Sequence, residues 1–243
     1  MTVPLFPGGT AVSALQVYDW ESEDGLSGGT PHVHTVSTEG YVVTAGSGSV
    51  HTLSAAGAER VPLEPGAVVW FSPGTIHRLV NDGGLELVVV MQNAGLPEAG
   101  DAVFTFPVHI LADPAAYEQA AALSQDWPED QRERGARARR DLALEGYRDL
   151  LAAVDRHGPA ALDRFRRLAA ELVRPRVERW RTMWAGTVEA ETERTRRQLD
   201  ALAAGDGAHL AGGTVIRGEP RPGARLFGMC GRLQTWQPPA ESH

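Results

Sequence analysis

Three histidines and one glutamate are the residues of this sequence best suited to chemistry. His32 and His34 stand two positions apart, Glu39 follows shortly after them, and His77 comes just after the dipeptide Pro73-Gly74. In a β-strand, residues i and i+2 point to the same face, so His32 and His34 present two imidazoles to one side. Three imidazoles with one carboxylate suit Fe, Mn, Ni, Cu or Zn, whereas calcium and magnesium prefer sites made only of oxygen.

Residues near these four are candidates for a substrate pocket. Tyr41 shares the strand alternation of Glu39, which predicts that it faces the interior, either as a hydrogen-bond donor or general acid or as a residue that only lines the barrel. The predicted pocket walls are Trp70, Phe71, Asn81, Met91 and Gln92, with His51 as a further interior polar group. Two alternatives stay open: ordinary core packing for the apolar members, and bracing of a strand end for Asn81. We expect Arg78 to point away from the side of His77, to a surface or an interface.

The first 112 residues have the composition of short strands separated by turns. The predicted strands are Val12–Tyr18, Thr30–Val36, Gly40–Ala45, Ser47–Leu53, Ala67–Ser72, His77–Asn81 and Leu85–Gln92. Segments between them, such as Gly46-Ser-Gly48 and Asp82-Gly83-Gly84, are rich in residues that form turns. Many short strands at close spacing predict a sandwich or a barrel. Leu87–Met91 is apolar on both faces, which predicts a central, covered strand.

The two ligand-bearing segments resemble the two motifs of the cupin family. That family's first motif is His-x-His, three or four residues, Glu, six residues and Gly, and this sequence has His32, His34, four residues, Glu39, six residues and Gly46. The second motif is a glycine, a proline-glycine turn, a histidine and an asparagine, matched here by Gly66, Pro73-Gly74, His77 and Asn81. One departure is that Pro73 adjoins Gly74 directly. The resemblance covers roughly residues 10–110.

The resemblance implies a fold and a cofactor. We expect a mainly β chain: a cupin-type double-stranded β-helix, or jelly-roll barrel, followed by an α-helical region and a short strand-like C-terminal segment. By resemblance, one divalent transition metal ion per chain is held by His32, His34, Glu39 and His77. Fe(II) or Mn(II) is favoured, with Ni, Cu or Zn as alternatives.

The chain becomes helical in character beyond residue 112. We predict a barrel over residues 1–112, a helical extension over 113–204 and a tail over 205–243 that packs on the barrel or on a partner subunit. Asp113-Pro114 and Pro128 predict helix starts, and Pro175 predicts a kink. Trp180 and Trp184 share one helix face, which favours a homodimerisation arm over a lid above the barrel mouth.

Charge and cysteine content exclude several classes of function. Residues 1–112 carry 11 acidic side chains against two arginines, and residues 113–204 carry 17 of each. Nucleic acid is therefore not an expected partner, because binding phosphates requires a net positive face. No segment is apolar enough for a membrane helix, and the N-terminus lacks the pattern of a secretory signal. The single cysteine, Cys230, excludes an internal disulfide. We predict a cytoplasmic protein.

These features predict a metalloenzyme acting on a small organic molecule. Our first choice is a dioxygenase-type oxidoreductase, with dioxygen as a second substrate. The alternative is an isomerase or lyase that uses the metal as a Lewis acid on a sugar or keto acid. A second alternative is a cupin that binds a small molecule without catalysis, since one fold hosts many functions.

Overall fold

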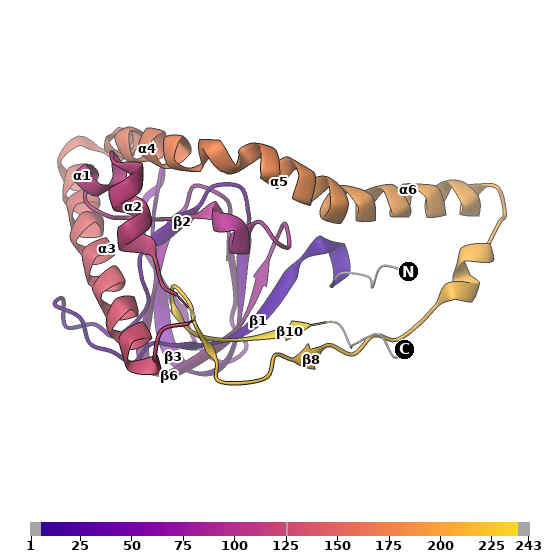
Figure 1. Cartoon of the computed structure of the whole chain (residues 1–243), viewed down its shortest axis with the longest axis horizontal. Helices are drawn as coiled ribbons and strands as arrows, with labels where there is room; N and C mark the ends of the chain where they lie inside the picture. Colours follow the sequence, from indigo (N-terminus) through magenta and orange to yellow (C-terminus); the bar gives the residue numbers. More distant parts are fainter. Residues whose placement is uncertain (1–5, 125, 238–243) are drawn as a thin grey trace.

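The computed structural model describes residues 6–124 and 126–237. An antiparallel β-barrel forms one side of the molecule, and helices enclose it on two others (Figure 1). The strands are β1 Ala11–Val17, β2 His32–His34, β3 Glu39–Ser54, β4 Gly57–Leu63, β5 Val68–Phe71, β6 Ile76–Met91, β7 Ala102–Phe104, β8 Glu219–Pro220, β9 Leu226–Phe227 and β10 Gly231–Gln237. The predicted jelly-roll barrel with a following helical region is confirmed.

Two long strands replace four of the predicted short ones. Gly40–Ala45 and Ser47–Leu53 are parts of β3, and His77–Asn81 and Leu85–Gln92 fall largely within β6. The glycines between them form irregularities in the β3–β6 ladder rather than turns. Gly46 has φ 71°, and a Cβ there would lie 2.1 Å from the carbonyl oxygen of Gly84. The bulge therefore requires glycine and lets both strands bend around the barrel.

β6 is the central strand of the barrel, between β1 and β3. Its central position agrees with the prediction for Leu87–Met91, but its burial alternates: Leu87 and Val89 are buried, whereas Val88 and Val90 are half-buried. β4 and β7 were not predicted. β4 is largely exposed and contains Glu59 and Pro62, which are uncommon in strands, and β7 has three residues, too few for a recognisable pattern.

The tail returns to the barrel of its own chain. β10 pairs antiparallel with β1, from Ser13 opposite Thr235 to Val17 opposite Gly231. The division of the chain at residues 112 and 204 stays a prediction.

The helices are α1 Val108–Leu111, α2 Pro114–Ala121, α3 Glu129–His157, α4 Asp163–Val173, α5 Val177–Trp184 and α6 Ala190–Ala203. Asp113 caps α2, because its side chain accepts hydrogen bonds from the backbone nitrogens of Ala115 and Ala116. α3 begins after Pro128, as predicted. A short 3₁₀ turn at Arg174–Arg176, around Pro175, separates α4 from α5. None of the described helices is long and apolar enough to cross a lipid bilayer.

Two hydrophobic cores meet at the barrel wall. One fills the barrel interior and includes Leu15, Tyr41, Val43, Val50, Leu79 and Leu87. The other lies between the barrel and the helices and includes Val33, Phe104, Phe106, Tyr147, Phe165 and Trp180. Trp180 was predicted as part of an exposed dimerisation stripe, and this is wrong: its indole is buried within its own chain, while Trp184 remains exposed. Homodimerisation itself stays a prediction.

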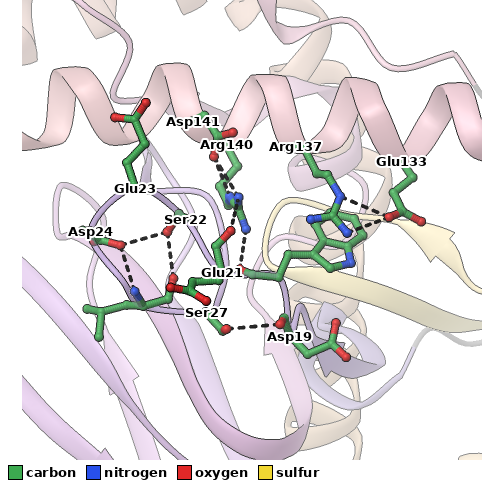
Figure 2. A network of polar contacts seen from close by, with 12 residues as sticks. Asp19, Glu21, Ser22, Glu23, Asp24, Ser27, Glu133, Arg137, Arg140 and Asp141 are labelled. Atoms are coloured by element: carbon green, nitrogen blue, oxygen red, sulfur yellow. Dashed lines mark hydrogen bonds and ion pairs between the residues drawn. The ribbon is translucent and has the colours of Figure 1, made fainter.

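A polar network fastens α3 to the loop between β1 and β2 (Figure 2). Arg140 donates hydrogen bonds to the carbonyl oxygens of Trp20 and Glu21, at 2.6 and 3.1 Å. The guanidinium of Arg137 lies 4.2 Å from the centre of a Trp20 ring. Arg78, predicted at a surface or interface, is only 2% exposed and forms an ion pair with Asp24 of this loop. Its side chain does point away from His77, but the loop and α3 cover that face.

Candidate metal centre

Strand geometry brings the four predicted ligands together. β2 carries His32 and His34, β3 begins at Glu39, and His77 is the second residue of β6. His32 and His77 are directly paired across β2 and β6. One potential ligand atom from each of the four side chains lies within 4.8 Å of all the others, and all four side chains are buried. Alternation on β2 and pairing with β6 therefore create a single cluster inside the barrel.

The Glu39 carboxylate lies at the centre of this cluster. Its Oε2 is 3.0 Å from Nε2 of His77 and 3.3 Å from Nε2 of His34. The rings of His32 and His77 have centroids 4.2 Å apart. Three imidazoles thus surround one carboxylate oxygen, a donor set that suits a transition metal.

The rings of His32 and His77 are fixed by a hydrogen bond at Nδ1, and the ring of His34 makes a charge contact, without a hydrogen bond, at the same atom. Nδ1 of His32 donates a hydrogen bond to the carbonyl oxygen of Thr30 at 2.8 Å, and Nδ1 of His77 donates to that of Thr75 at 3.1 Å. Nδ1 of His34 lies 3.3 Å from Oδ2 of Asp101. Because carbonyl and carboxylate oxygens only accept, the proton stays on Nδ1 and the lone pair of a neutral ring is at Nε2, toward the cluster.

The cluster fits a bound cation. Within the described residues, Nε2 of His77 and Oε2 of Glu39 are buried without a hydrogen-bond partner, although they face each other. Two electron-rich atoms this close repel each other unless a positive charge lies between them. A divalent transition metal held by His32, His34, Glu39 and His77 supplies that charge. The donor set and its unpaired atoms agree with the expected single metal ion per chain and do not select among the metals.

The pKa values follow from the close packing of these groups. Burial lowers the pKa of His32 well below its usual value, and the neighbouring His77 and His34 add to the effect. Burial opposes the charged form of His34, but the carboxylates of Asp101 and Glu39 outweigh it and raise the pKa of His34 to about 9. Burial likewise opposes ionisation of Glu39, yet contacts with His34 and His77 hold its pKa well below the ordinary range. The site thus keeps its carboxylate ionised and His32 neutral, whereas His34 holds a proton that a metal bound at the cluster would displace.

Tyr41 lies beside the cluster, as its alternation predicts. Its side chain is 1% exposed, and its hydroxyl has no hydrogen-bond partner in the part of the chain that the structure describes. Burial raises the pKa of Tyr41 well above its ordinary value, and the charge of Glu39 adds to this. The Phe71 ring contacts both Tyr41 and His77, with ring centroids 5.4 and 4.2 Å away. Tyr41 therefore remains a protonated hydroxyl in an apolar pocket next to the ligands.

The other predicted pocket residues divide between two faces. Met91 is buried in the barrel interior near Tyr41, and Phe71 packs against the same interior core. Trp70 is not a pocket wall: it alternates with Phe71 on β5 and its side chain is 71% exposed on the outer face. Gln92 is also exposed, and its amide oxygen accepts a hydrogen bond from the backbone of Thr38.

Asn81 and His51 also lie away from the cluster. Asn81 braces the barrel, since its amide donates to the carbonyl oxygen of Val17 and accepts from the backbone nitrogens of Gly83 and Leu85. His51 neighbours the buried Val50 on β3 and so faces the outer side, opposite Arg78 in the β3–β6 register. Burial and the charges of Arg60 and Arg78 lower its pKa to about 4.

Asp101 is the residue of the site that the sequence did not reveal. It belongs to neither motif and precedes β7 in the helical turn Pro97–Asp101. No regular spacing links it to the histidines, so only the fold brings it to His34. Its pKa is lowered, because its contacts with His34 and Thr35 outweigh the effect of burial.

A groove with a cavity volume of about 470 Å³ adjoins the same end of the barrel. His34, Thr35, Val36 and Gly74 line it on the barrel side, and α4 and α5 form the opposite wall. Its helix wall is mainly apolar and includes Phe165, Ala170 and Trp180, and its charged members are Arg166, Glu171 and Arg174. A volume of this size is typical of pockets for small organic ligands.

Several proteins of known structure are similar to part of the chain. No curated protein is significantly similar to the chain. Among solved structures, it resembles an uncharacterized conserved protein with a double-stranded β-helix domain from Klebsiella pneumoniae subsp. pneumoniae MGH 78578, at 18% identity and a TM-score of 0.29, over 37% of this chain and 73% of that chain. It also resembles a predicted oxalate decarboxylase from Thermotoga maritima, at 25% identity and a TM-score of 0.26, over 34% of this chain and 63% of that one.

A third similar structure is WlaRA, a TDP-fucose-3,4-ketoisomerase from Campylobacter jejuni, at 11% identity and a TM-score of 0.31, over 37% of this chain and 64% of that one. The family description that matches the sequence is the cupin domain, over residues 20–92. That range contains β2 to β6 and all four clustered side chains. Residues 20–92 of this chain therefore match the cupin domain, and this matched part carries all four clustered side chains.

Proposed function

We propose that the protein is a mononuclear metal-dependent enzyme that acts on a small organic molecule. The observation that carries this proposal is the convergence of four buried ligand-type side chains in one cluster. At the centre of the cluster, Oε2 of Glu39 and Nε2 of His77 have no hydrogen-bond partner in the described residues. Bound Fe(II) or Mn(II) supplies either redox chemistry with dioxygen or Lewis-acid activation of a substrate oxygen. The chain's own residues orient the ligands and exclude water from them.

The surroundings of the site favour oxygen chemistry as the reaction. Tyr41, Phe71 and Met91 place aromatic and thioether groups around the ligands, and all four ligand side chains are closed to solvent. An oxidation of this kind benefits from a dry site, because water competes with the organic substrate and with reactive species. The groove beside β2, with its mainly apolar wall and charged members of both signs, supports an organic substrate that is partly apolar and carries a polar group.

A second reaction is favoured by Tyr41. Its hydroxyl is buried, protonated and free of any hydrogen bond in the described residues. Such a group can donate a proton to a substrate oxygen or carbon, as an isomerase or lyase requires. The two reactions differ in whether turnover consumes dioxygen, which an oxygen electrode measures directly.

Metal analysis tests the proposal. Untagged protein purified without chelators is compared with His77→Ala and with the control His51→Ala, which removes a histidine outside the cluster. We expect close to one equivalent of metal in the wild type and in His51→Ala, and loss of metal in His77→Ala. No uptake of Fe(II), Mn(II), Co(II), Ni(II) or Zn(II) by the wild type would leave only a binding barrel without a metal function.

A further inference from the structure

We propose that Asp101 is a positioning residue for the metal centre, and that Trp180 of the helical region holds the segment that carries it. The inference rests on the proposed metal site and assigns a role to two residues outside the cupin motifs. Asp101 acts through His34, and Trp180 acts through the turn that precedes Asp101.

Asp101 first fixes the loop that follows β2. Its side chain is fully buried, and its Oδ1 accepts hydrogen bonds from the backbone nitrogens of Thr35 and Val36, both at 2.8 Å, and from the Thr35 hydroxyl at 2.6 Å. Oδ2 accepts from the backbone nitrogen of Ser37 at 3.1 Å. Three successive backbone nitrogens thus point at one carboxylate, which defines the path from His34 to Glu39.

Asp101 also determines which nitrogen of His34 faces the cluster. Its Oδ2 lies 3.3 Å from Nδ1 of His34, whose Nε2 points to Glu39. A carboxylate cannot donate a hydrogen bond, so in the neutral ring that a metal requires, the proton stays on Nδ1 beside Asp101 and Nε2 is left for the metal. Backbone pairing places the two residues in register, because Ala102, the next residue after Asp101, is paired with His34. For His32 and His77, the backbone carbonyl oxygens of Thr30 and Thr75 keep the proton on Nδ1. Among the three histidines of the cluster, His34 is therefore the one whose Nδ1 faces a side chain.

The helical region holds the segment that carries Asp101. Nε1 of Trp180, on α5, donates a hydrogen bond to the carbonyl oxygen of Ala99 at 3.1 Å. Trp180 is buried in the core shared by the barrel wall and the helices. A continuous series of contacts therefore runs from α5 through Ala99 and Asp101 to His34, and the helices contribute to the metal centre without supplying a ligand.

Asp101→Asn separates the two roles of the carboxylate. The amide oxygen can still accept from Thr35 and Val36, which leaves the amide nitrogen to face His34. That nitrogen donates to Nδ1, so the ring must carry its proton on Nε2 and cannot bind a metal there. The matched control is Thr35→Val, which removes a hydrogen bond to Asp101 without touching His34.

The experiment is a Co(II) titration of the metal-free protein, read by the visible absorption of the bound ion and by competition with a chelator. We expect Asp101→Asn to bind Co(II) 10- to 100-fold more weakly than the wild type, and Thr35→Val to stay within about twofold. Equal affinity for Asp101→Asn and the wild type would overturn the proposal. Equal losses in both variants would also overturn it, because loop fastening alone would then explain them.

A second pair of variants covers the case in which Asp101→Asn does not fold. Trp180→Phe removes the indole donor and keeps an aromatic ring, whereas Trp184→Phe changes an exposed residue of the same helix. We expect a several-fold loss of Co(II) affinity in Trp180→Phe alone, and equal affinities in the two variants would contradict the proposal. Failure of the wild type to bind Co(II) would instead refute the metal site itself, so the two failures are distinct.

Discussion

Glu39 and His77 face each other inside the barrel with 3.0 Å between a carboxylate oxygen and an imidazole nitrogen, and neither atom has a hydrogen-bond partner in the described chain. Such a contact is unfavourable between two lone pairs and becomes favourable when a cation binds both. Metal binding and folding stability are therefore coupled at this point of the structure.

Glu39→Gln tests that coupling. The amide can donate a hydrogen bond to Nε2 of His77, so we expect the metal-free variant to be at least as stable as the wild type. It loses the charge that attracts a metal, and so added Co(II) should no longer stabilise it. In the wild type, free metal at a hundredfold excess over Kd should raise the free energy of unfolding by about 2.7 kcal/mol. Guanidinium unfolding with and without Co(II) measures both effects, and equal stabilisation of the two proteins would contradict this account.

Tyr41→Phe should stabilise the protein. The buried hydroxyl of Tyr41 has lost its water without gaining a partner, and removing it relieves about 1 kcal/mol or more. Tyr18→Phe is the matched control, because the hydroxyl of Tyr18 donates to the carbonyl oxygen of Gly228 at 3.0 Å. We expect the control to be destabilised by about 1 kcal/mol. Thermal unfolding measures both, and destabilisation of Tyr41→Phe would show that its hydroxyl does have a structural partner.

The pH dependence of stability should include a contribution from His51. Its pKa is lowered to about 4 in the folded protein, against about 6.5 in an unfolded chain. Between these values the unfolded state binds the extra proton, so stability is complete above about pH 6.5 and is lost as pH falls toward 4.

His51→Gln cannot take up this proton. We expect its loss of stability between neutral pH and about pH 4.5 to be smaller than that of the wild type. Guanidinium unfolding of both metal-free proteins at the two pH values makes the comparison. Parallel pH profiles would show that His51 titrates normally.

Gly46→Ala should weaken the barrel more than Gly57→Ala. Both glycines have positive φ, which costs a side chain about 1–2 kcal/mol. Only at Gly46 does a Cβ also collide with the backbone of Gly84, whereas nothing lies within 4 Å of one at Gly57. The difference between the melting temperatures of the two variants measures the loss of stability caused by the clash at Gly46. Equal melting temperatures would mean that β6 can shift to make room for the side chain.

Ala170→Trp should obstruct the groove without disturbing the metal site. Ala170 is an exposed residue of α4 that lines the groove, so a larger side chain can enter without replacing a core residue. With a substrate found by oxygen-uptake screening, we expect a KM at least about tenfold higher and an unchanged metal content. Arg167→Trp, at an exposed α4 position outside the groove lining, is the control. An unaffected KM in Ala170→Trp would place substrate entry elsewhere.

The ligand positions could be predicted from the sequence because they depend on local rules. The alternation of β2 joins His32 to His34, and the Pro73-Gly74 turn sets the start of the strand that carries His77. The predictions for Trp70 and Gln92 failed because the pairing register between strands determines which side chains turn into the barrel. Glu39 pairs with Phe71 and with Met91, which brings those two side chains inside and turns their neighbours outward. Register depends on the partner strand, which periodicity within one strand does not reveal.

Asp101 and Trp180 lay beyond prediction for a different reason. Their contacts join segments far apart in the chain, through a loop and a helix packing that no local pattern specifies. Helix starts, by contrast, followed from single residues such as Asp113 and Pro128. The metal identity, the reaction, the homodimer and the cytoplasmic location stay predictions.

The three residues of β2 belong to both halves of the molecule. His32 and His34 face the metal cluster, while Val33 between them is buried in the core formed with the helices. Side chains of neighbouring residues on opposite sides of one strand cannot move independently. Evolution and protein engineers consequently have little freedom to exchange the helical layer for another: a replacement must pack against Val33 in the same way, or the ligand geometry changes with it.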